Sequence, residues 1–180
     1  MLLLNKMKKI FTLVAAWMLV ASSSYAGDGD TFLNVSGGWQ ANTQRFKSPI
    51  VNALVGMEFE GKYHNAWEVY VDLSTAYEKC PIHGKVDSKS FWSYKTFGIG
   101  GAYKPAFIRR KNSVVRWRFG TDLGANKSGF QASVDLGLEY SYSFRNGMQF
   151  FVLQKNDFVF WSRDHFRNGI LIGVKFPLSK

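Results

Sequence analysis

A short run of polar residues near the C-terminal end comes nearest to catalytic machinery. Ser162, Asp164 and His165 lie within four residues of one another, and such residue types serve acyl transfer or deacylation of a lipid. Neighbouring residues of an extended strand point to opposite faces, so this run alone does not bring a serine hydroxyl beside a histidine ring. We interpret the run as a polar loop and expect no enzyme activity, with a lipid A-modifying enzyme as an alternative.

Metal and cofactor chemistry are not indicated either. The single cysteine, Cys80, cannot form an internal disulfide, and the chain has only three scattered histidines, too few for a structural zinc site. The run 98–101 is rich in glycine, but Tyr103 occupies the third glycine position that a dinucleotide-binding loop requires. We therefore expect no catalytic residue, no cofactor and no metal.

Short β-strands are the elements that would position any functional group. Apolar and polar residues alternate along most of the chain, and this period of two separates them onto the two faces of a strand. The short segment 61–65 and the Asn146-Gly147 pair separate neighbouring strands, and Asn-Gly supplies the positive φ angles of a tight primed hairpin. The pattern predicts eight strands, over 33–40, 51–60, 67–78, 96–103, 115–123, 130–140, 148–161 and 169–176.

The volume of the apolar side chains indicates which face of these strands points outward. An eight-stranded barrel holds about a dozen large side chains inside, whereas the apolar faces contain far more, including several Trp and Phe. We therefore predict an all-β, eight-stranded, antiparallel up-and-down barrel with its apolar wall outside, as in an outer-membrane barrel. The alternative is a soluble barrel of the lipocalin kind, whose apolar face points inward.

The opposite face carries small residues together with charges of both signs. An unpaired charge in a narrow lumen would cost on the order of several kcal/mol, so we predict that these charges pair and that the barrel has no open pore. The predicted lumen network comprises Glu58, Glu68, Asp72, Arg116, Arg118, Asp122, Asp135, Glu139 and Lys175.

Aromatic residues make up 17% of the chain, and several lie near strand ends on the apolar face. Because Trp and Tyr concentrate at the two interfaces of a membrane, we predict an interfacial girdle; ordinary strand propensity is the alternative explanation. The predicted girdle comprises Trp39, Phe59, Trp67, Tyr77, Tyr103, Trp117 and Tyr140.

The segment 1–26 is typical of a secretory signal peptide. Three lysines precede an apolar stretch, and Ser24-Tyr25-Ala26 places small residues where a signal peptidase reads. We expect cleavage before Gly27, which leaves 27–180 as one barrel domain exported through the periplasm to the outer membrane. The net charge is +10. Because the basic residues are scattered through loops and turns, we expect contact with anionic lipid or no specific partner, rather than nucleic acid.

Turn lengths assign the two ends of the predicted barrel. Periplasmic turns of such barrels are short and outer loops are longer, so 61–65 and the Asn146-Gly147 turn are placed in the periplasm. The segment 105–113 would then be a long, basic periplasmic turn. The predicted outer loops are 42–49, 78–90, 124–129 and 155–166.

Three stretches carry a family resemblance. The connection from Tyr103-Lys104-Pro105 to Arg110, and the runs Met148-Gln149-Phe150-Phe151-Val152-Leu153 and Asn168-Gly169-Ile170-Leu171-Ile172-Gly173-Val174-Lys175-Phe176, resemble the TraO proteins of conjugative transposons. The resemblance implies a small exported protein in the outer-membrane part of a DNA-transfer apparatus, with other transfer proteins as partners and no catalytic residues. The alternative is a general small outer-membrane barrel of the OmpX or OmpW kind, serving adhesion or surface stability. Unlike most such barrels, the chain ends on Pro177-Leu178-Ser179-Lys180 rather than on an aromatic residue.

Overall fold

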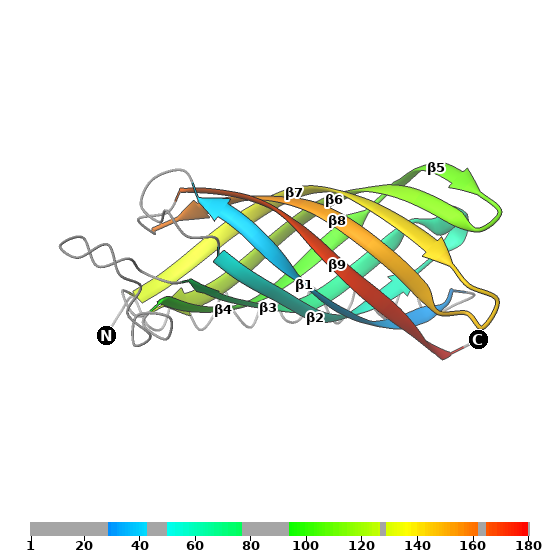
Figure 1. Cartoon of the computed structure of the whole chain (residues 1–180), viewed down its shortest axis with the longest axis horizontal. Helices are drawn as coiled ribbons and strands as arrows, with labels where there is room; N and C mark the ends of the chain where they lie inside the picture. The colour runs from blue at the N-terminus through cyan, green and yellow to red at the C-terminus, as the bar shows by residue number, and fades with distance from the viewer. Residues whose placement is uncertain (1–28, 43–49, 77–93, 127–128, 162–164, 180) are drawn as a thin grey trace.

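Almost all of the described chain is antiparallel β-structure (Figure 1). A computed structural model describes residues 29–42, 50–76, 94–126, 129–161 and 165–179. The eight barrel strands are β1 (Thr31–Asn42), β2 (Ile50–Glu60), β3 (Ala66–Ala76), β4 (Tyr94–Lys104), β6 (Ser113–Asn126), β7 (Gly129–Ser143), β8 (Gln149–Phe160) and β9 (Phe166–Ser179).

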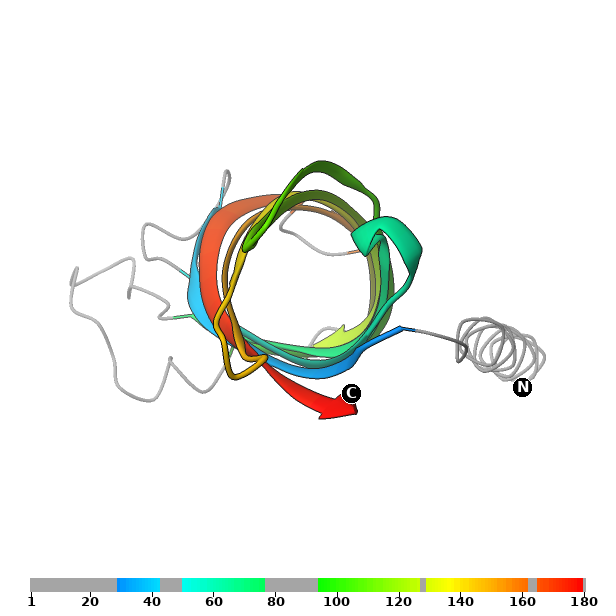
Figure 2. The same ribbon diagram turned by 90° about the vertical axis from the view of Figure 1, so that its right-hand side faces the viewer.

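The strands close into a ring, which Figure 2 shows along the barrel axis. Each barrel strand pairs with the next one along the chain, and β4 pairs directly with β6. The first and last strands also pair, from Thr31 opposite Ser179 to Asn42 opposite Arg167. The predicted eight-stranded antiparallel barrel is therefore confirmed. Because each of these eight strands has two neighbours, the ring has no free edge strand.

The segment 105–113, predicted as a long basic turn, instead contains a ninth strand. Strand β5 (Ala106–Arg110) pairs with the first residues of β6 and extends the wall beyond the barrel rim (Figure 1). Pro105 lies between β4 and β5, and proline has no backbone N–H to donate to a ladder. Pro105 interrupts the strand pattern between β4 and β5, and the sequence after it was therefore interpreted as a turn.

Two of the predicted outer loops are also too long. Strand β6 continues to Asn126 and β8 continues to Phe160, so parts of 124–129 and 155–166 belong to strands. Polar residues in these stretches, such as Lys155 and Asp157, suggested loops, but they are buried inside the barrel. The predicted loops 42–49 and 78–90 fall almost entirely outside the described residues.

The hairpin between β7 and β8 has another geometry than predicted. The Gly147 N–H donates to the Phe144 carbonyl at 3.1 Å, and Gly147 has a φ of 86° whereas Asn146 has no positive φ. This is an unprimed turn followed by a left-handed glycine, which suits a longer hairpin loop. The predicted primed Asn-Gly turn is therefore wrong.

Side-chain burial separates the two faces of the wall. Apolar side chains such as Val35, Phe119 and Ile172 are exposed on the outside, while most buried residues inside are polar or charged. An apolar layer interrupts this polar interior, which explains why the alternation in β8 is irregular. It consists of Leu54, Tyr70, Ala102, Phe151, Leu153 and Leu171. Within the described residues, no helix has the length and apolar character needed to cross a membrane.

Candidate functional site

The charged lumen is the most elaborate polar site of the described chain. Eight of the nine predicted lumen charges take part in ion pairs inside the barrel. Most of the charged residues in the lumen form two groups on either side of the apolar layer, while Arg118 and Asp135 lie next to that layer itself. The larger group lies toward the end of the barrel that carries the short turns, and we call it the turn-end cluster: Glu58, Glu60, Glu68, Lys104, Arg116, Glu139 and Lys175.

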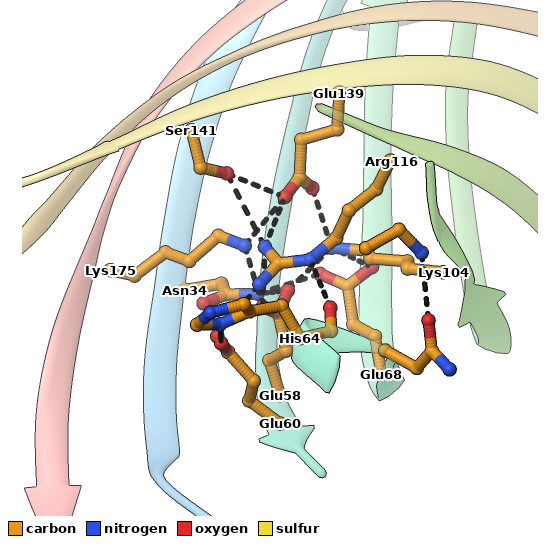
Figure 3. Close-up of polar contacts among 12 residues, drawn as sticks. Asn34, Glu58, Glu60, His64, Glu68, Lys104, Arg116, Glu139, Ser141 and Lys175 are labelled. Carbon is orange, nitrogen blue, oxygen red and sulfur yellow. Dashed lines mark hydrogen bonds and ion pairs between the residues drawn. The ribbon is translucent and has the colours of Figure 1, made fainter. Parts of the chain in front are cut away.

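Two fully buried carboxylates, Glu58 and Glu139, are central to the turn-end cluster (Figure 3). The Lys175 Nζ lies 2.6 Å from Oε1 of both carboxylates. The Lys104 Nζ lies 2.6 Å from Glu58 Oε2 and 2.7 Å from Glu139 Oε2. Arg116 also contacts both, at 3.5 Å and 3.2 Å. Each carboxylate therefore shares the same three cations.

These contacts span the full width of the barrel. Glu58 is on β2 and Glu139 is on β7, and three strands separate β2 from β7 in either direction around the ring. A lysine that contacts both carboxylates must therefore lie between opposite walls. The lumen is bridged by side chains at this level, as expected for buried charges that must be compensated.

The cluster also ties the barrel to its nearest turn. The Arg116 Nη2 lies 2.7 Å from Glu60 Oε2, and its Nε donates to the His64 carbonyl at 2.8 Å. The His64 ring in turn contacts the Glu60 carboxylate. His64 belongs to the 3-10 turn η1 (Lys62–His64) between β2 and β3. The guanidinium thus fixes the turn against the end of the lumen.

A second arginine joins the cluster to the apolar layer. The Arg118 guanidinium lies 4.5 Å from the centre of the Tyr70 ring and 3.2 Å from Glu68, and it also pairs with Asp135. The Tyr70 hydroxyl donates to Asp135 Oδ2 at 2.7 Å. The Phe151 ring lies beneath the Lys175 Nζ at 5.2 Å. Rings, charges and apolar side chains therefore fill the centre of the barrel together.

A smaller group occupies the opposite half of the lumen. The Lys155 Nζ lies 2.6 Å from Asp72 and 3.0 Å from Asp157. Amides complete the shells of these carboxylates, with Asn52 donating to Asp72 at 2.6 Å and Gln40 donating to Asp157 at 2.7 Å. These residues come from β1, β2, β3 and β8, so they also cross-link separate parts of the wall.

Asp122 departs from the predicted pairing. None of the ion pairs between described residues involves it; its carboxylate accepts a hydrogen bond from the Ser133 hydroxyl. It lines a cavity of 10 Å³ together with Asp72, Asp157 and Arg167, which leaves room for about one water molecule. The Ser133 hydroxyl is thus the hydrogen-bond donor to Asp122, and Arg167 is the cation in the lining of the same cavity.

Several charged residues that lie in the lumen were missing from the prediction. Lys104 was assigned to a connection, although counting by twos from Gly100 and Ala102 places it on the inner face. In β8 the inward Phe151 and Leu153 obscured the phase of the strand. The charged residues missing from the prediction are Glu60, Lys104, Lys155, Asp157 and Arg167, all buried in the barrel.

The predicted girdle residues within the described chain lie on the outer face. Phe59, Trp67, Tyr103 and Phe119 are successive partners across β2, β3, β4 and β6, so they form a continuous aromatic row. The Trp67 and Tyr103 rings lie 4.8 Å apart. Three of the predicted girdle residues are exposed: Trp39, Trp117 and Tyr140. Tyr77 lies outside the described residues.

The residues considered for catalysis and for metal binding lie apart from this network or outside the described chain. Within the described ranges, no group of three or more His, Cys, Asp or Glu residues is placed to hold a metal ion. His165 is exposed, and its carbonyl accepts from the Val159 N–H at 2.9 Å. The rest of the Ser162–His165 run, Cys80 and the signal segment 1–26 lie outside the described residues. No known family model matches the chain, and no curated protein does.

Replacing Lys104 by Met is expected to lower the free energy of unfolding by about 3–5 kcal/mol. The change leaves Glu58, Glu68 and Glu139 buried without one of their cations, and breaking one partner of a buried ion network has a cost of this size. Urea unfolding in detergent micelles, followed by tryptophan fluorescence, measures the effect. Lys111→Met is the control, since Lys111 is exposed at the tip of a hairpin, and equal stability of the two variants would contradict the assignment.

Proposed function

We propose that this chain is a non-enzymatic outer-membrane β-barrel protein with a sealed lumen, serving as a structural or accessory component of a surface apparatus. The observation that carries the proposal is the reversed polarity of the barrel. Charged residues are buried inside, whereas apolar residues cover the outside. Lipid is the solvent in which such a wall is favourable.

Every barrel strand contributes large apolar side chains to the outer wall. Soluble monomers rarely expose contiguous apolar patches beyond a few hundred Å², whereas here the exposed residues follow one another around the ring. Immersion in lipid removes this surface from water, at about 25 cal/mol per Å². One example from each strand in ring order is Trp39, Val55, Leu73, Phe97, Phe119, Leu136, Phe158 and Ile172.

Two features at the turn end support an interface with lipid head groups. The aromatic row from Phe59 to Phe119 lies on the outer face, where girdle residues of such barrels are found. The turns themselves are basic, which favours contact with anionic phospholipid. Their exposed cations are Lys62, Arg109, Arg110, Lys111 and Arg145. We therefore orient this end toward the periplasm.

Leu136→Arg is expected to cost about 2–4 kcal/mol of folding free energy in lipid vesicles, because Leu136 lies on the outer face midway along β7. Tyr142→Arg, on the same face of the same strand but near the turn, is the matched control and should cost about 0–1 kcal/mol. Urea titration of vesicle-reconstituted protein measures both. A soluble barrel would tolerate both arginines, remain dissolved without detergent and show no heat-modifiable migration on gels.

A sealed lumen predicts that the reconstituted protein does not conduct ions. The lysines that join Glu58 to Glu139 bridge the lumen, and the apolar layer around Phe151 fills it at a second level. We expect these two levels to block a continuous aqueous path. Planar-bilayer recordings of the purified protein should show no steady single-channel steps, with a porin in the same bilayer as the positive control. Reproducible channel openings would contradict the sealed state.

The more specific role that we propose is that of an accessory protein in a conjugative DNA-transfer apparatus. Support comes from the sequence resemblance to TraO proteins in 103–110, 148–153 and 168–176. Deleting the gene in a donor strain should lower the transfer frequency, and the wild-type gene should restore it. Unchanged transfer together with altered adhesion or surface stability would favour a general small barrel instead, and neighbouring transfer genes would favour the first role.

A further inference from the structure

Three amide side chains interrupt the apolar outer wall on β8 and β9. We call them the amide cluster: Gln154, Asn156 and Asn168. Asn156 and Asn168 are direct partners across the two strands. Gln154 and Asn156 exchange two hydrogen bonds, of 2.9 Å and 3.2 Å, and Asn168 Nδ2 donates to the side-chain oxygen of Asn156, Oδ1. The cluster is thus ordered, rather than a set of solvated surface residues.

The position of the cluster is unusual for a lipid-facing wall. Along the outer face of β8 it has Val152 and Phe150 on one side and Phe158 and Phe160 on the other. On β9, Asn168 is the third residue of the strand, and it lies between Phe166 and Ile170 on the outer face. Apolar side chains therefore flank the cluster on both strands. An amide in hydrocarbon gains nothing from lipid tails, and polar residues in such places commonly serve as contacts between membrane segments.

The two asparagines of the cluster differ in how much of their hydrogen-bonding capacity is used within the chain. Asn156 also donates to the Leu136 carbonyl at 3.0 Å, so its hydrogen-bonding capacity is used within the chain. Asn168 is exposed, and its side-chain oxygen accepts no hydrogen bond from a described residue. Among the described residues, Asn168 therefore keeps one donor position and its acceptor oxygen unused, and its neighbour along the outer face is Ile170, which is 55% exposed.

We propose that this part of the wall is a self-association surface, on which a second copy of the chain docks through Asn168. A primary amide both donates and accepts, so two copies related by a two-fold axis can place Asn168 against Asn168 and satisfy both. The apolar residues around the cluster would pack against the same residues of the second copy. The proposal rests on the membrane location proposed above.

Disulfide trapping in lipid vesicles tests the interface. In a Cys80→Ser background, Asn168→Cys should form a covalent dimer on mild oxidation. Ile99→Cys is the matched control, because Ile99 is exposed on the outer face of β4, which lies opposite β9 in the ring. It should remain monomeric. Equal dimer yields from both variants would indicate random collisions and overturn the proposal.

A second measurement does not depend on the introduced thiol. Light scattering in detergent should show a dimer of the wild-type chain, and Asn168→Leu should weaken the association constant by about tenfold, the scale of an interfacial hydrogen bond in a membrane. A monomeric wild-type chain, or a disulfide from the Asn168→Cys variant to a different protein, overturns self-association. If heat-modifiable migration and vesicle insertion persist while dimers are absent, this inference alone fails and the membrane barrel stands.

Discussion

The compensation of buried charge across a closed ring is the constraint on which the rest of the structure depends. Glu58 and Glu139 make six ion pairs with the same three cations, and five different strands supply these five residues. Moving any one of these strands out of register would leave a charge buried without its partner, at a cost on the order of several kcal/mol. The charges thereby select one register and one closure from the many that a period of two allows.

The interior is organised in layers, and this organisation limits what the barrel does. Two polar groups are separated by a layer of apolar side chains around Tyr70 and Phe151. Glycines accommodate these rings: a Cβ at Gly173 would lie 2.6 Å from the Phe151 ring. A filled centre favours rigidity over transport. Function is therefore to be sought on the surfaces, namely the outer wall and the two ends.

The outer wall and the turn end differ in the partners that they favour. The wall is apolar and has an aromatic row near one end. The amide cluster of β8 and β9 interrupts it, and we interpret this cluster as a contact surface. The turn end is basic and carries the projecting β5–β6 hairpin, where Phe107 stacks on Trp117 at 5.3 Å. The outer wall, the amide cluster and the turn end are thus three chemically distinct surfaces.

The fold class was accessible from sequence because strand periodicity and side-chain volume are local or additive properties. Alternation located all eight barrel strands, and the excess of large apolar residues indicated the outward face. Most charges of the turn-end cluster, such as Glu58 and Arg116, were assigned to the inner face from the alternation of residues along their strands. Lys104 and Lys155 were not, since Pro105 and the inward Phe151 hid the phase of their strands. Which charges meet was decided only by closure of the ring, because strands far apart in the chain, such as β2 and β7, face each other only in the folded barrel.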